Sequence, residues 1–195
     1  MNNEKLSKVP ITYPIIVKPL AIAGTVQSHK MSILFSKHAL NRICGSPVLL
    51  QQYTNHDSLL YKVYVLGDTV WVFPRSSLPN LPTITQEHNS SYVEFDSQKP
   101  YPDLSAFCPT SKVFKKPKIK HKVTITAQEV QPIVKALRKS FQLELFGFDV
   151  LLHTDGNEIM VVDVNYFPSY KEVLNFPKYL ARYLTKRAID ARKQS

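Results

Sequence analysis

The chain has 195 residues, of which 44% are hydrophobic and 21% charged, an ordinary balance for a globular protein with a sizeable core. Its formal net charge of +10 predicts a polyanionic partner: nucleic acid, an anionic membrane surface or a small phosphorylated substrate. The sequence has two cysteines without metal-ligand spacing, no signal-peptide core and no apolar run of membrane-spanning length, so we expect no membrane insertion and a cytoplasmic protein, with the nucleus as a second location.

The first part of the chain alternates short apolar segments with turn residues. A strand ending in Lys18 leads into a small, polar, glycine-bearing loop at 19–30, and Ser36 is placed to cap a short helix through Ile43. Gly67-Asp68 separates two apolar segments, as in a β-hairpin. The repeated hairpins indicate a mostly antiparallel α+β fold with few helices. Strands are expected at residues 13–18, 31–35, 47–53, 59–66 and 69–73.

The middle of the chain has no regular pattern. From Arg75 to about Lys122 it is rich in Pro, Ser, Asn and Lys, which predicts a long loop that is either disordered or a functional lid. The basic run Lys112–Lys122 is typical of a solvated segment. The alternatives are a flap that attracts anions and a nuclear-import signal.

Two helices are predicted toward the C-terminus. Thr126 and Glu129 have the spacing of a capping box, which predicts a helix from there to about Phe141. Pro132 conflicts with that start, because its ring would clash with the carbonyl group four residues earlier. The helix therefore either begins at Pro132 or kinks there. A second helix is expected from about Pro177, with apolar residues along one stripe.

Two apolar segments, 146–152 and 161–167, carry oxygen-bearing side chains at Asp149, Asp163 and Asn165. Asp163 and Asn165 are two residues apart, and alternate strand residues point to the same face. Asp-Gly turn chemistry between the segments predicts an antiparallel hairpin, which would bring Asp149 beside the other two. Two carboxylates and an amide oxygen suit Mg²⁺. The alternative is a set of polar residues on a solvated sheet face.

Several cationic side chains stand where they could meet phosphate groups. Lys18 precedes the small-residue loop, which could fold over a nucleotide's phosphates. Lys62 lies within an apolar strand, where a lysine needs an anionic partner. Arg75 and Ser77 follow the next strand. Lysines, a mobile loop and oxygen-only metal ligands together indicate phosphoryl transfer, in which positioning and charge neutralisation supply most of the catalysis.

Other polar residues leave their role open. Gln51 and Gln52 end a buried strand, where they either simply leave the core or hydrogen-bond an adenine edge. His29 lies in the loop and is either a phosphate contact or an ordinary surface residue. The sequence contains no recognisable Ser/His/Asp triad, cysteine nucleophile or zinc-ligand grouping.

Taken in order and spacing, several segments resemble the inositol 1,3,4-trisphosphate 5/6-kinase family, also called inositol-tetrakisphosphate 1-kinases. Asn55-His56 and Tyr61–Val65 are among the most specific parts of the resemblance. The segments that carry it are 13–20, 24–32, 48–68, 75–79 and 149–170.

The resemblance implies an ATP-grasp fold: two mostly antiparallel sheet lobes with flanking helices and the nucleotide cleft between them. We expect one lobe over residues 1–75 and the other over 76–195, the latter including a flexible basic loop at about 79–122. The implied activity is transfer of the γ-phosphate of ATP, with two Mg²⁺ ions, to a hydroxyl or a phosphate of an inositol polyphosphate. A monomer is expected, and nucleic acid is not expected as a partner.

The resemblance also implies roles for individual residues. The expected catalytic residues are Lys18, Lys62 and Arg75. The expected nucleotide contacts are Lys18, Gln51, Gln52, Tyr53, Thr54, Tyr61, Lys62 and Ser77. The expected contacts with the inositol phosphate are Gly24, His29, Lys62, Asn165 and Ser169. The expected magnesium ligands are Asp149, Asp163 and Asn165.

The chain departs from the family pattern in three places, one of which is the lysine-rich stretch and Pro132, where no family pattern is recognised. The family normally begins with a separate N-terminal α/β domain and a further ATP-binding segment, which have no counterpart in this sequence. Ser169 stands where the family has glycine, which permits a closer backbone approach than serine. The alternative function is therefore a non-catalytic remnant that binds nucleotide or inositol phosphate. A third hypothesis is a nucleic-acid-binding module that uses Lys112–Lys122.

Overall fold

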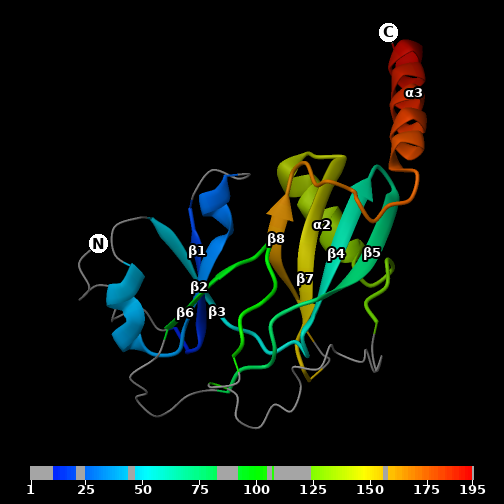
Figure 1. Cartoon of the computed structure of the whole chain (residues 1–195). Helices are drawn as coiled ribbons and strands as arrows, with labels where there is room; N and C mark the ends of the chain where they lie inside the picture. Colours follow the sequence, from blue (N-terminus) through cyan, green and yellow to red (C-terminus); the bar gives the residue numbers. More distant parts are fainter. Residues whose placement is uncertain are drawn as a thin grey trace. The chain divides into compact units, whose positions relative to one another are not determined.

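The structure, a computed structural model, describes residues 11–20, 25–43, 47–82, 92–104, 107, 124–155 and 158–194 (Figure 1). The chain divides into two compact units. The first comprises Met1–Ser58 and Ser77–Lys118, and the second Leu59–Ser76 and Ile119–Ser195. This division differs from the single boundary expected after residue 75, because the hairpin at 59–76 pairs with the strand at 145–152 and so belongs to the second unit.

The first unit contains an antiparallel sheet with the strand order β3-β1-β2-β6. Short 3₁₀ helices follow β1 and β2, and the second of them occupies the place of the helix expected after Ser36. The elements are β1 (Ile15–Pro19), η1 (Val26–His29), β2 (Lys30–Leu34), η2 (Lys37–Ile43), β3 (Val48–Gln52) and β6 (Tyr92–Asp96).

Both faces of this first sheet are covered by apolar side chains. On one face, Ile15, Val17 and Leu34 pack with Leu40 of η2. On the other, Ile33 packs in a cluster with Tyr53 and with residues from the segments after residue 76, among them Leu78. Alternation of side chains along each strand sends neighbouring residues into the two clusters, which explains why β1 is apolar at almost every position.

β6 corrects the expectation that no regular structure lies between Arg75 and Lys122. Tyr92–Asp96 pairs with β2 from Lys30↔Asp96 to Leu34↔Tyr92. In the described part of the chain this five-residue strand pairs with β2 alone. Its sequence pattern is weak, because pairing with a distant segment rather than local propensity holds it in place. The basic run Lys112–Lys122 lies outside the described residues.

The second unit contains an antiparallel sheet with the strand order β5-β4-β7-β8 (Figure 1). Gly67 closes the β4–β5 hairpin with a φ of 55°, a conformation that favours glycine, and Tyr183 of α3 lies against it. The elements are β4 (Leu59–Leu66), β5 (Thr69–Ser76), α2 (Gln131–Phe141), β7 (Leu145–Leu152), β8 (Ile159–Asn165) and α3 (Phe176–Gln194).

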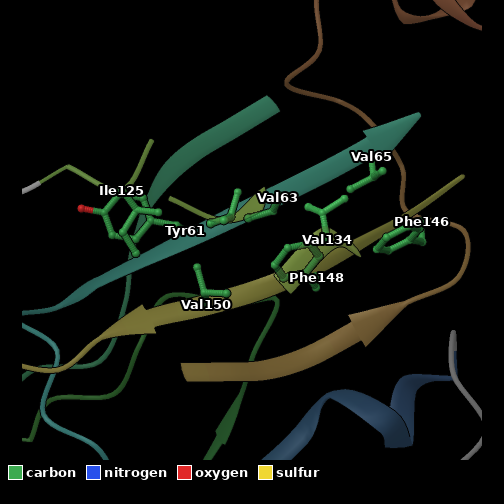
Figure 2. Packing of buried hydrophobic residues seen from close by; sticks show 9 residues of the cluster. Tyr61, Val63, Val65, Ile125, Val134, Phe146, Phe148 and Val150 are labelled. Carbon is green, nitrogen blue, oxygen red and sulfur yellow. The ribbon is translucent and has the colours of Figure 1, made fainter. Parts of the chain in front are cut away.

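One face of the second sheet forms the core of this unit. Tyr61, Val63 and Val65 of β4 and Phe146, Phe148 and Val150 of β7 are at most 1% exposed, and they pack with Val134 of α2 (Figure 2). Figure 1 shows α2 lying across this face. Because successive residues of a strand point to opposite faces, the residues between these core positions lie on the other face of the sheet.

The start of α2 resolves the conflict between the capping box and Pro132. Thr126 and Glu129 do form the reciprocal bonds of a capping box, with Glu129 N at 3.3 Å from Thr126 Oγ1 and Thr126 N at 2.7 Å from Glu129 Oε2. These bonds stabilise a turn that precedes the helix, and α2 itself begins at Gln131, which places Pro132 in its first turn. Proline is tolerated there because its missing N–H has no helical partner to lose.

Among the described helices, none combines the length and the apolar character that crossing a membrane requires.

Candidate active site

The second sheet carries a row of ionic side chains on the face opposite α2. Lys62 of β4 lies directly across from Asp149 of β7, and Asp149 lies directly across from Asp163 of β8. The strand neighbours Val63, Phe148 and Val164 belong to the core, so the three ionic residues project from the other face. The antiparallel register thus places one cation and two carboxylates side by side.

The contacts within this row are close. Lys62 Nζ lies 3.1 Å from Asp149 Oδ1 and 3.0 Å from Asp149 Oδ2, and the two side chains are 32% and 15% exposed. The Asn165 amide donates to Asp163 Oδ2 over 2.7 Å. The predicted anionic partner of Lys62 is therefore Asp149, and the predicted hairpin does bring Asp149 beside Asp163 and Asn165. We refer to these four residues as the Lys62 row.

The donor set of the Lys62 row fits Mg²⁺, which the fold family implies. Asp149, Asp163 and Asn165 offer carboxylate and amide oxygens from two adjacent strands, the hard ligands that Mg²⁺ prefers. The described residues contain no group of three or more His, Cys, Asp or Glu side chains that could hold a metal ion. The Lys62 row has only two carboxylates, so bound phosphates and water would have to complete the coordination.

Arg75, at the end of β5, makes an ion pair with Glu172. The hydroxyl of Tyr64 donates to the other oxygen of the same carboxylate. Tyr64 is two residues after Lys62 and shares its face of β4. Burial raises the pKa of Tyr64, the Arg75 cation lowers it and the Asp149 carboxylate raises it. The Tyr64 hydroxyl therefore interacts electrostatically with both ionic groups.

Glu172 stands on a firmly anchored turn. The Tyr170 hydroxyl donates to Val65 O over 2.6 Å, and the Tyr170 ring stacks on Phe176 with a centroid separation of 3.8 Å. The Glu172 side chain is 18% exposed, whereas that of Arg75 is 49% exposed. A largely buried carboxylate therefore holds a more exposed guanidinium, which retains further N–H donors for an anion. Ser169, just before this turn, is exposed.

The first unit holds other residues of the predicted nucleotide set. Lys18 of β1 and Gln51 of β3 lie on the same face of the sheet, since β1 pairs Ile16 with Gln51 and Lys18 with Leu49. Gln52 is paired with Ile15 and projects from the opposite face. The structure therefore groups Lys18 with Gln51 and separates both from Gln52.

His29, at the end of η1, contacts the turn that follows β6. Its Nε2 lies 3.0 Å from Gln98 Nε2, and its Nδ1 lies 3.4 Å from Ser97 Oγ. The backbone N–H of Ser97 also donates to His29 O over 2.9 Å. The ring is thus held from two sides. Gly24, predicted as a neighbouring substrate contact, lies outside the described residues.

The remaining predicted nucleotide contacts differ in exposure. Tyr53 is buried and donates its hydroxyl to Pro79 O over 2.6 Å. Thr54 and Ser77 are half-buried and are joined through His56. Tyr61 is 1% exposed and lies in the α2-covered core, so its side chain serves packing (Figure 2).

The sequence did not predict a site role for Glu172, Tyr64 or Gln98. It also did not predict the structural role of His56. Tyr64 had a usable signal, since it is two residues from Lys62 in a strand and must share its face. Glu172 and Gln98 had none, because each reaches its partner through tertiary contacts between segments far apart in sequence.

Residues 2–186 match the sequence model of a family described as the inositol 1,3,4-trisphosphate 5/6-kinase ATP-grasp domain. An inositol-tetrakisphosphate 1-kinase of Danio rerio is 33% identical over 174 residues, which are 89% of this chain and 42% of that protein. Inositol-tetrakisphosphate 1-kinase 1 of Arabidopsis thaliana is 30% identical over 180 residues (89% and 54%), and inositol-tetrakisphosphate 1-kinase 4 of Oryza sativa subsp. indica is 28% identical over 186 residues (93% and 50%). The chain spans about half the length of the curated relatives it matches.

Among solved structures, an ATP-grasp ligase from Chryseobacterium gregarium, in complex with ADP and a leader and core peptide, is similar with a TM-score of 0.50. It is 10% identical in sequence, and the match covers 87% of this chain and 46% of the ligase. At that identity the likeness supports the fold alone. The family match covers nearly the whole chain, and the two antiparallel sheets agree with it. The chain therefore belongs to the inositol 1,3,4-trisphosphate 5/6-kinase family and has the ATP-grasp fold.

Proposed function

We propose that this protein is an ATP- and Mg²⁺-dependent kinase that phosphorylates an inositol polyphosphate. The observation that carries the proposal is the Lys62 row: within a chain matched to the family over residues 2–186, a lysine, two aspartates and an asparagine lie side by side on one sheet face. A cation beside hard oxygen donors is the arrangement that phosphoryl transfer requires.

Each residue has a distinct task in this proposal. Mg²⁺ held by Asp149, Asp163 and Asn165 would neutralise charge on the phosphates of ATP. Lys62 would exchange part of its contact with Asp149 for a phosphate oxygen. Arg75, oriented by Glu172, would hold a second anionic group. The acceptor hydroxyl oxygen bonds to the γ-phosphorus as the bond to ADP breaks, and the hydroxyl proton leaves to solvent. A loose transition state makes a strong general base unnecessary.

The remaining predicted residues would bind the rest of each ligand. We assign Lys18 and Gln51 to the nucleotide, because they share one face of the first sheet. We assign His29 and Ser169 to the inositol phosphate. His29 is held by Ser97 and Gln98, and Ser169 is exposed beside the Glu172 turn.

A second candidate, a non-catalytic binder of nucleotide or inositol phosphate, is favoured by one contact. Lys62 lies within hydrogen-bond distance of both Asp149 oxygens, so a metal ion at Asp149 must compete with an ammonium group. If that ion pair persists with ligand bound, the chain would bind anions and transfer phosphate poorly.

The test is phosphate transfer from Mg-ATP to a panel of inositol tris-, tetrakis-, pentakis- and hexakisphosphates, with products resolved by NMR. The control is Asp163→Ala, which removes one proposed ligand from an exposed position. We expect a product that disappears in this variant. A folded wild-type protein that binds ATP and the inositol phosphates but yields no product would refute the kinase and support the binder. Product formation that survives Asp163→Ala would refute the assignment of the site.

A further inference from the structure

Apart from tyrosines, His56 is the most buried polar residue in the described part of the chain, at 4% exposure, and the proposed chemistry does not use it. It lies in the first unit, between two segments that approach each other. Its Nδ1 is 2.6 Å from Thr54 O, and its Nε2 is 2.8 Å from Ser77 Oγ. A buried imidazole with both nitrogens hydrogen-bonded has a defined tautomer.

The partners of His56 decide which nitrogen carries the proton. A carbonyl oxygen can only accept, so Nδ1 must donate its hydrogen to Thr54 O. In a neutral imidazole the other nitrogen, Nε2, then has no hydrogen and accepts. The Ser77 hydroxyl must therefore donate to Nε2. Burial lowers the pKa of His56, which keeps the ring neutral at neutral pH, although the Thr54 carbonyl and the Asp57 carboxylate oppose the shift.

Both segments around His56 are locked in place. The Asn80 side-chain oxygen accepts from the backbone N–H of His56 over 3.0 Å and from that of Asp57 over 2.9 Å. Asp57 and Ser58 have φ angles of 52° and 59°, which cost free energy for non-glycine residues and need such support. The backbone N–H of Ser77 also donates to Ser58 O over 2.8 Å. Ser77 is thus fixed through its backbone and through its hydroxyl.

We propose that His56 is a positioning residue that turns Ser77 into a hydrogen-bond acceptor for the nucleotide. With its only hydrogen directed to His56, the half-buried Ser77 hydroxyl can offer just its lone pairs to a ligand. It therefore takes a hydroxyl or amino hydrogen of the adenosine part, and it cannot donate to a phosphate oxygen. This inference rests on the proposed function, because it takes Ser77, which the family resemblance implies to be a nucleotide contact, as part of the ATP site of that kinase.

The first test reads the tautomer directly in the full-length wild-type protein. Side-chain ¹⁵N NMR at neutral pH, with His56 assigned by its loss in His56→Gln, should show a protonated Nδ1 and an unprotonated Nε2. A hydrogen on Nε2, in either a neutral or a charged ring, would overturn the inference. This measurement needs no ligand.

The second test uses two variants that each keep one contact of His56. The amide oxygen of His56→Gln can replace Nε2 as the acceptor for Ser77, whereas His56→Asn reaches only the position of Nδ1. Calorimetric titrations with ADP and with inorganic tripolyphosphate, both with Mg²⁺, compare these variants with wild type and Ser77→Ala. Thermal unfolding confirms that each titrated variant is folded.

We expect Ser77→Ala and His56→Asn to weaken ADP binding by about fivefold to tenfold, the effect of one hydrogen bond. His56→Gln should retain most of the affinity, and combining His56→Asn with Ser77→Ala should weaken ADP binding no further. Tripolyphosphate binding should stay unchanged throughout. Equal losses for ADP and tripolyphosphate, no loss in Ser77→Ala, or equal behaviour of the two His56 variants would each overturn the inference.

The outcomes separate this inference from the kinase proposal. Wild-type protein that binds ADP but transfers no phosphate would refute the kinase and leave the His56 result standing. A working kinase whose Ser77→Ala variant binds ADP normally would refute the role of His56 and leave the kinase proposal standing. A wild-type protein that binds no ADP would remove both.

Discussion

The two faces of the β5-β4-β7-β8 sheet are built from the same strands, but one face is apolar and buried and the other is charged and partly exposed. On one face Val63 and Phe148 are each 1% exposed and lie in the core cluster that α2 covers. On the other, Lys62 and Asp149 pair while they keep 32% and 15% of their side-chain surface exposed. The strand period of two is what separates them, because adjacent residues such as Phe148 and Asp149 point in opposite directions.

This difference shows how a small domain can carry a charged site without weakening its core. The apolar face supplies free energy of folding through burial and close packing. The polar face holds ion pairs whose net contribution to stability is small when they are partly exposed. Substitutions on the first face should therefore change stability, and substitutions on the second should change activity.

The largest effect is expected for Phe148→Ala. Phe148 is 1% exposed in the α2-covered cluster, so its truncation leaves a cavity and should lower the free energy of unfolding by about 3–5 kcal/mol. Urea unfolding followed by circular dichroism measures this loss. Phosphate transfer per folded molecule should stay near the wild-type value. If the variant does not fold, Val134→Ala on α2 gives a milder version of the same test.

Asp149→Asn, one residue further along β7, should behave in the opposite way. The substitution keeps the shape of the side chain and removes the charge that faces Lys62 at 3.0 Å. We expect phosphate transfer to fall by at least about 100-fold, as for other electrostatic contacts to the transition state. The free energy of unfolding should change by about 1 kcal/mol or less, since the pair is partly exposed. Activity that survives the substitution would contradict the claim that the charged face of the sheet carries the active site.

Much of this two-faced sheet could be predicted from the sequence. The Asp-Gly turn and the spacing of Asp163 and Asn165 predict a hairpin with Asp149 beside them, and strand pairing confirms it. The anionic partner of Lys62 also follows from the cost of an unpaired charge among apolar residues. These features share a local cause: turn chemistry and strand alternation act over a few residues.

The features that could not be predicted depend on contacts between distant segments. Glu172 and Arg75 lie far apart in the sequence, and no spacing rule links them. Among the described strands β6 pairs with β2 alone, and its five residues form no distinctive pattern. For Tyr61 the two sources of expectation give different information: family resemblance implies a nucleotide contact, and alternation along β4 puts its ring in the core.

Gly147→Ala should lower both stability and substrate binding, with a smaller loss of stability than Phe148→Ala and a smaller effect on the reaction than Asp149→Asn. Gly147 lies on the polar face of β7, across from Asn165, where an added Cβ would stand 2.9 Å from Pro168 Cγ and 3.0 Å from Val63 O. Because such overpacking forces backbone to shift, we expect about 1–3 kcal/mol of destabilisation. The shift would move the segment that carries Ser169, so the KM for the inositol phosphate should rise. Unchanged KM with lowered stability would show that this segment does not contact the substrate.

The smallest effect is expected on lowering the pH, which should reduce the stability that Glu129 contributes through the turn before α2. The backbone N–H of Thr126 donates to the Glu129 carboxylate and holds the pKa of Glu129 below its ordinary value of 4.5. A carboxyl group whose pKa is lower in the folded state stabilises the fold above its unfolded pKa, and this contribution is lost as the pH falls through the folded value. Urea unfolding at several pH values should therefore show wild type slightly more stable than Glu129→Gln above pH 4.5, with the difference shrinking in stronger acid.

The Lys62 row lies on the opposite face, so Glu129→Gln should leave phosphate transfer at neutral pH unchanged. A difference in stability that grows on acidification would contradict the assigned role of Glu129, and a loss of activity at neutral pH would show that the two faces are coupled through α2.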